Sequence, residues 1–205
     1  MKTVVYIDHY DSFSDILIDY INQLELNVIR VMTDHIDIDK IRSLEPDHIV
    51  IGPGPGSPYD TSLADVYTLI KCFYRSIPFL GICLGHQILG VFYGGSVMRL
   101  PKVRHGVVSK LKDLDMGVFE GFHCQSSDLH VTRYHSLILN NETIKKTELM
   151  ITCTCIDNNT RIIMGIRDMF LPVYGFQFHP EAIMTDCGLE LCRYILAGGA
   201  NHRIG

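Results

Sequence analysis

Hydrophobic residues follow two alternating patterns over the first hundred residues. Runs of four or five mostly apolar residues predict buried strands at 3–7, 28–31, 48–51 and 79–82. Between these runs, apolar residues spaced three or four apart predict helices at 13–24, 38–44 and 63–73. Strands that alternate with helices favour an α/β fold, a doubly wound and mostly parallel sheet flanked by helices.

The pattern changes after about residue 95. Short strand-like runs follow one another through turns such as 157–159 (Asp-Asn-Asn), which predicts a smaller antiparallel excursion in the second half. The predicted strands are 96–100, 107–111, 129–134, 149–156, 162–166 and 173–178. An amphipathic helix at 186–196, capped by Gly198-Gly199, is expected to close the chain.

Composition favours a single domain over residues 1–205. The chain is 47% hydrophobic and 20% charged, which suits one sizeable core. Its 205 residues are too few for two ordinary domains. The net charge is −5 and no Lys/Arg run occurs, so nucleic acid is not an expected partner. Met1-Lys2-Thr3 leads straight into a strand, and no apolar stretch of about 18 residues exists, so we expect neither secretion nor a membrane segment.

The seven cysteines are scattered along the chain and odd in number. They do not resemble a disulfide framework, so a cytoplasmic location is expected. Cys153-Thr154-Cys155 could form half of a metal site, but no second Cys or His pair lies at zinc-like spacing. We therefore expect neither a metal nor a cofactor in this chain.

The candidate chemistry centres on residues 81–87 (Gly-Ile-Cys-Leu-Gly-His-Gln). Cys83 lies between a predicted strand and the first turns of a helix, with Gly81 and Gly85 two residues to either side. This layout is typical of a nucleophile elbow, where the turn is too sharp for a β-carbon at either flank. The helix N-terminus would favour the thiolate form of Cys83. A buried cysteine beside a tight turn is the alternative.

A nucleophilic cysteine needs a base, and residues 175–181 (Gly-Phe-Gln-Phe-His-Pro-Glu) offer one. Pro180 biases His179 toward an extended conformation, in which residues two apart face the same way, so Glu181 can lie beside the imidazole. His179 would accept the thiol proton and Glu181 would stabilise the imidazolium. A strand-end histidine followed by a surface glutamate is the alternative.

Attack on a carbonyl group also needs donors for the developing oxyanion. The backbone N–H of Leu84, directly after Cys83, is the first candidate. The second is the loop 52–58, in which Gly54-Pro55-Gly56 lets the backbone approach a substrate closely. A rigid turn and a phosphate cradle are alternatives, although the loop lacks the Lys or Arg of a phosphate loop.

Together, the segments 81–87, 178–181 and 53–58 resemble class I (triad) glutamine amidotransferases. Residues 10–13 (Tyr-Asp-Ser-Phe) and 133–137 (Arg-Tyr-His-Ser-Leu) are more narrowly similar to the amidotransferase subunits of chorismate-using synthases. Those are anthranilate synthase component II and the aminodeoxychorismate synthase amidotransferase. The likeness runs from about residue 3 to residue 196 and implies a single glutamine amidotransferase domain.

This resemblance implies a substrate, a reaction and a partner. Cys83 would attack the side-chain amide of glutamine, His179 and Glu181 would complete the triad, and water would hydrolyse the γ-glutamyl thioester. The ammonia released would reach chorismate in a separate synthase subunit, which implies a heteromer. The residues implied to bind glutamine and its oxyanion are Gly54, Pro55, Gly56, Leu84, Gln87, Ser136 and Leu137.

Two other function classes compete with this interpretation. One is an enzyme of the same fold with another acceptor, such as a γ-glutamyl hydrolase or a nucleotide-synthesis amidotransferase; residues 10–13 and 133–137 disfavour it. The other is a catalytically silent interaction subunit, which the intact Cys83, His179 and Glu181 disfavour. Anthranilate and 4-amino-4-deoxychorismate are both compatible products.

Two positions depart from the family pattern. His9 stands where asparagine is common, and Ala182 stands where serine commonly follows His-Pro-Glu. The first leaves open the hydrogen bonding beside the first strand, and the second leaves open the support of Glu181. Lys102, Arg104 and His105-Gly106 either face the partner or form a solvated turn.

Overall fold

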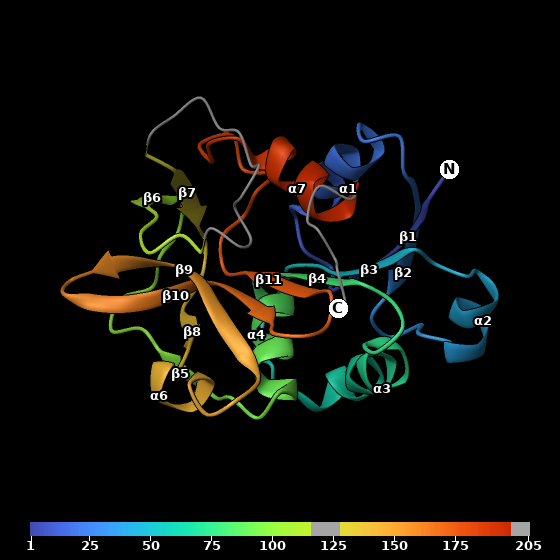
Figure 1. Ribbon diagram of the computed structural model, residues 1–205, viewed down its shortest axis with the longest axis horizontal. Helices are drawn as coiled ribbons and strands as arrows, with labels where there is room; N and C mark the ends of the chain where they lie inside the picture. Colours follow the sequence, from blue (N-terminus) through green and yellow to red (C-terminus); the bar gives the residue numbers. More distant parts are fainter. Residues whose placement is uncertain (116–127, 198–205) are drawn as a thin grey trace.

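The computed structural model describes residues 1–115 and 128–197, and a seven-stranded sheet forms its centre. The strands of this sheet are β1 (Thr3–Asp8), β2 (Asn27–Met32), β3 (His48–Ile51), β4 (Phe79–Ile82), β9 (Leu149–Asp157), β10 (Thr160–Asp168) and β11 (Val173–Phe176). Their order is β2-β1-β3-β4-β11-β10-β9 (Figure 1). The strands from β2 to β11 pair in parallel, and β10 and β9 continue the sheet antiparallel. The predicted doubly wound, mostly parallel sheet is confirmed.

Helices cover both faces of this sheet because successive strand residues point to opposite sides. Along β1, Val4 and Tyr6 pack in one core cluster, whereas Val5 and Ile7 pack in another. Helices α1 (Ser14–Asn22) and α7 (Gly188–Leu196) supply the first cluster (Figure 1). The second receives side chains from α2 (Ile38–Ser43), α3 (Ala64–Phe73), which the turn η1 (Thr61–Leu63) precedes, and α4 (Leu84–Phe92).

The second half adds two small antiparallel sheets. They pair β5 (Val97–Arg99) with β8 (Leu137–Leu139), and β6 (Val107–Lys110) with β7 (His130–Arg133). Neither β8 nor the short helix α6 (Asn141–Ile144) was predicted from the sequence. The predicted Gly198-Gly199 cap lies outside the described residues.

The place assigned to one predicted strand is wrong. The strand predicted at 173–178 was assigned to the antiparallel excursion, but β11 pairs in parallel with β4 and lies inside the main sheet. All four of its residues are buried. Gly175 allows this position, because a β-carbon there would lie 3.0 Å from Nδ1 of His86 on α4.

Most of the described cysteines are free thiols. Cys72, Cys83, Cys153, Cys155 and Cys192 are free. Cys187 is disulfide-bonded, which the sequence analysis did not predict. Separately, no helix within 1–115 and 128–197 combines the length and the apolar character that a membrane crossing requires.

The parallel strands bring the predicted chemistry to one edge. Asp8 ends β1, the loop 52–58 follows β3, Cys83 follows β4, and His179 lies shortly after β11. The carboxyl ends of parallel strands meet at the same edge of a sheet, which is where α/β folds bind ligands. The fold therefore gathers segments that are distant in the sequence.

The packing of α4 on β3 can be tested at Gly85. A β-carbon there would lie 2.1 Å from the Ile51 carbonyl oxygen, a backbone atom that cannot easily move. We expect Gly85→Ala to lower the free energy of unfolding by about 1–3 kcal/mol, even though alanine favours helices. Urea denaturation measures this difference. The exposed Lys71→Ala on α3 is the control and should change stability by less than about 0.5 kcal/mol; an equally small effect at Gly85 would contradict the close packing.

Candidate active site

Cys83 occupies a strained turn between β4 and α4. Its φ of 51° and ψ of −99° form a conformation that costs a non-glycine residue about 1–3 kcal/mol. The turn is anchored on β11, because the Cys83 N–H donates to the Phe176 carbonyl oxygen at 2.8 Å. A β-carbon on Gly81 would lie 2.5 Å from the backbone of Gly85. The predicted elbow geometry, including the need for glycine at both flanks, is confirmed.

His179 and Glu181 form a buried pair beside this turn. Nδ1 of His179 lies 2.7 Å from Oε1 of Glu181, and both residues are 2% exposed. The His179 N–H donates to the Thr132 carbonyl oxygen at 3.1 Å, which fixes the backbone as a short extended bridge. The predicted juxtaposition of His179 and Glu181 is confirmed, and the alternative of a surface glutamate is wrong.

Two aromatic rings hold the imidazole in place. The ring of Phe13 lies 5.1 Å from that of His179, and the ring of Tyr134 lies 5.3 Å from it. The loop that carries Phe13 is tied to Asp8, which accepts hydrogen bonds from Tyr10 N and Ser14 Oγ, both at 2.8 Å. The sequence indicated residues 10–13 only as a family marker, and this packing role was missed.

The charge state of His179 follows from its neighbours. Burial lowers its pKa, but the interactions with Cys83 and Glu181 outweigh burial and raise the pKa to about 10. Because Nδ1 faces Glu181, Nε2 is the nitrogen available to Cys83. Nε2 is buried and has no hydrogen-bond partner among the described residues. The arrangement favours the protonated imidazolium form of His179.

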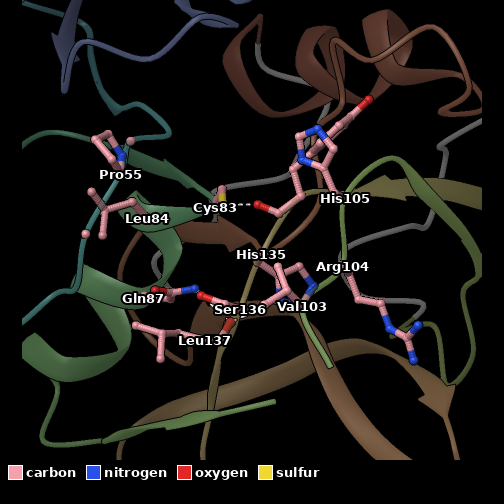
Figure 2. A pocket seen from close by; sticks show the side chains of 13 residues that line it. Pro55, Cys83, Leu84, Gln87, Val103, Arg104, His105, His135, Ser136 and Leu137 are labelled. Atoms are coloured by element: carbon pink, nitrogen blue, oxygen red, sulfur yellow. Dashed lines mark hydrogen bonds between the residues drawn. The ribbon is translucent and has the colours of Figure 1, made fainter. Parts of the chain in front are cut away.

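A pocket of about 190 Å³ opens at the sulfur. It brings together Cys83 and all seven residues that the sequence implied for glutamine and its oxyanion: Gly54, Pro55, Gly56, Leu84, Gln87, Ser136 and Leu137. Figure 2 shows Pro55, Leu84 and Gln87 on one side and Val103, Arg104 and His105 on the other. His179 and Glu181 are not among the residues that line this pocket, although His179 interacts with Cys83.

The donors proposed for an oxyanion lie at the same place. Leu84 is the first residue of α4, so its N–H has no acceptor inside the helix. The loop 52–58 approaches it closely, since a β-carbon on Gly54 would lie 3.0 Å from Cδ2 of Leu84. Gly56 has a φ of +90°, which glycine adopts without strain.

Gln177 is a polar residue of the site that sequence reasoning missed. It is fully buried, and its Nε2 lies 3.7 Å from the Cys83 sulfur. Its Oε1 accepts a hydrogen bond from Nε2 of Gln87 at 3.0 Å. The signal was present in the alternation of residues 177, 179 and 181, which places Gln177 on the same side as His179.

The far wall of the pocket rests on a buried ionic cluster. Arg104 donates from Nε to Asp157 at 2.6 Å, and Arg133 donates from Nη1 to the same carboxylate at 3.1 Å. These hydrogen bonds outweigh burial and lower the pKa of Asp157. In Figure 2 the Arg104 guanidinium points away from the pocket. The interpretation of a solvated turn is therefore wrong for Arg104, whose side chain is 14% exposed.

The two departures from the family pattern have different consequences. His9 is buried beside Gly54, where burial lowers its pKa to about 4, and its ring makes no hydrogen bond within the described residues. It contributes packing to the first strand's edge. Ala182 offers no side-chain donor, and Oε2 of Glu181 is buried without a hydrogen-bond partner among the described residues.

Comparisons with known proteins show which family and fold this chain resembles. The family model "Glutamine amidotransferase class-I" matches residues 5–197. Anthranilate synthase component 2 of Pseudomonas aeruginosa is 39% identical over 186 residues, 90% of each chain. Aminodeoxychorismate/anthranilate synthase component 2 of Bacillus subtilis is 38% identical over 192 residues, 93% of each chain. A solved structure of a putative GMP synthase protein from Thermoplasma acidophilum shares the fold, with a TM-score of 0.82 at 21% identity over 99% of this chain and 96% of that one.

The coupling of His179 to the sulfur predicts a change in its titration. The Cys83→Ala variant lacks the sulfur that raises the pKa of His179, whereas burial still lowers this pKa. The pKa of His179 should therefore fall below about 10. NMR titration of labelled imidazoles between about pH 5 and 11 measures this shift. His86 is an internal reference, because burial lowers its pKa to about 3 and it stays neutral throughout. An unchanged pKa would show that sulfur and imidazole do not interact.

Proposed function

The chain belongs to the class-I glutamine amidotransferase family, and on this basis we propose that it hydrolyses glutamine and supplies the ammonia to a chorismate-using synthase subunit. One observation carries the proposal: the Cys83 sulfur opens into a pocket lined by all the residues implied for glutamine, beside the buried His179–Glu181 pair. The proposed catalytic residues are Cys83, His179 and Glu181.

The reaction begins with attack of the Cys83 thiolate on the amide carbon of glutamine. The developing oxyanion accepts hydrogen bonds from the Leu84 N–H and the backbone of Gly54–Gly56. When the intermediate collapses, the His179 imidazolium gives its proton to the leaving nitrogen, and ammonia departs. Neutral His179 then takes a proton from water, which attacks the thioester and releases glutamate and the thiolate.

The amino-acid end of glutamine is assigned to the opposite end of the pocket. Nε2 of Gln87 is committed to the Leu137 carbonyl oxygen and to Gln177, so Oε1 of Gln87 is left to accept from the substrate ammonium group. Backbone groups of Ser136 and Leu137 line the pocket beside it. This placement puts the side-chain amide toward Cys83.

The two relatives described above support a synthase partner, because they are named as component 2 of anthranilate synthase and of aminodeoxychorismate/anthranilate synthase. Ammonia is useful to a chorismate-using enzyme only if it arrives unprotonated, so a heteromer is part of the proposal. We also propose one amidotransferase domain over the chain, which the family match over residues 5–197 supports.

The nucleophile is tested with the Cys83→Ala variant. With chorismate and a synthase subunit present, glutamine-dependent formation of the aromatic amine should fall by at least about 1,000-fold. The reaction driven by added ammonium should persist, because it needs no thioester. The exposed Cys72→Ala on α3 should retain both reactions. Loss of both reactions in the Cys83 variant would make Cys83 a structural residue.

The acceptor is tested by mixing the chain with each candidate synthase subunit, chorismate and glutamine. Formation of anthranilate or 4-amino-4-deoxychorismate, identified by mass spectrometry, is the expected result. Mixtures that lack the synthase subunit serve as the control and should yield glutamate but no aromatic amine. Failure to support either product with any synthase subunit would overturn the assignment of a chorismate-using partner.

A further inference from the structure

The buried hydrogen bonds behind Cys83 form a chain that crosses the site. It starts at the Leu137 carbonyl oxygen, which accepts from Nε2 of Gln87 at 3.0 Å. The same Nε2 donates to Oε1 of Gln177 at 3.0 Å, and Nε2 of Gln177 donates to the Cys83 sulfur at 3.7 Å. Two side-chain amides thus connect the glutamine-binding wall to the reactive atom.

The direction of this chain is fixed by its first member. A backbone carbonyl can only accept, so Gln87 must turn its NH₂ group toward Leu137. That NH₂ group also faces Gln177, so Gln177 must accept the hydrogen bond with its side-chain carbonyl oxygen. The NH₂ group of Gln177 is then left to donate to the sulfur. Reversing Gln177 would oppose two NH₂ groups, and reversing Gln87 would oppose its oxygen to the Leu137 carbonyl.

Burial makes it costly to reverse either of the two side-chain amides. Gln177 is 0% exposed and Gln87 is 3% exposed, so little water is available to replace a lost partner. An unpaired buried polar group costs about 1–3 kcal/mol, which penalises every reversed arrangement. The donor at the sulfur is therefore built into the fold.

We propose that Gln177 is a positioning residue that stabilises the Cys83 thiolate, and that Leu137 and Gln87 enforce this by orienting its amide. An N–H donor stabilises a thiolate more than a thiol, because charge-assisted hydrogen bonds are the stronger ones. The inference rests on the proposed function only in taking Cys83 as the nucleophile.

Other groups also face the sulfur and remain when Gln177 is changed. The N-terminus of α4 and His179, with Glu181 behind it, favour the thiolate. The Tyr134 carbonyl oxygen lies 4.0 Å from the sulfur and favours the thiol. Of the basic groups that line the pocket, His135 stays neutral because burial lowers its pKa to about 3, and Arg104 is paired with Asp157. His105 lines the pocket as well.

The experiment measures the thiolate directly by the pH dependence of iodoacetamide alkylation, followed on the Cys83 peptide by mass spectrometry. Gln177→Met keeps the volume and removes both polar atoms, and the alkylation midpoint should rise by about one pH unit. Gln177→Glu replaces the donor with an acceptor and should raise the midpoint further. The exposed Cys72 in the same digest is the reference and should not shift.

A second variant tests the orienting role without touching the sulfur. Gln87→Met leaves Gln177 in place but frees its amide to rotate, so the Cys83 midpoint should rise by less than in Gln177→Met. Unchanged alkylation midpoints of Cys83 in the folded Gln177→Met and Gln87→Met proteins overturn the proposal. If Gln177→Met does not fold, the midpoint in Gln87→Met alone decides whether the proposal stands. Glutamine hydrolysis by the wild type is measured separately, so its absence would refute the proposed function and not this hydrogen-bond chain.

Discussion

The contact between Gly85 and the carbonyl oxygen of Ile51 is the constraint from which the rest of the site follows. It lets the first turn of α4 press against β3 so closely that no side chain fits between them. The burial of Ile88 and Leu89 on the same helix stabilises this approach. With the helix held there, the short connection from β4 to α4 requires a strained backbone conformation, which Cys83 adopts. The conformation that places Cys83 at the pocket is thus maintained by packing behind it.

Electrostatics then distinguish one histidine from its neighbours. His86 and His135 are both buried, and in each case burial lowers the pKa to about 3 and keeps the ring neutral. His179 is equally buried, yet its pKa is raised because Cys83 and Glu181 face its two nitrogens. Burial supplies a low-dielectric setting, and the anionic partners decide which ring is charged. Of these three buried imidazoles, His179 is the one with a raised pKa.

Much of this organisation was predictable because it depends on local pattern. The strands 48–51 and 79–82 were predicted with their observed bounds, since continuous apolar runs between helices mark strands buried on both faces. The pairing of His179 with Glu181 followed from the two-residue period of an extended segment. The direction of β11 did not follow, because an apolar run is the same whether its neighbour is parallel or antiparallel. The sequence likewise predicts no more than a turn at Asp157, because its partners Arg104 and Arg133 are distant in the sequence.

The insertion of β11 between β4 and β10 has a consequence for how the enzyme is made. Gln177 and Cys83 are 94 positions apart, and β11 completes the sheet only after both neighbouring strands exist. As the chain leaves the ribosome, Cys83 emerges long before His179 and Gln177, the residues proposed to activate it, and closing so long a loop is a late folding event. The residues proposed to activate Cys83 therefore reach it only when β11 has taken its place between β4 and β10.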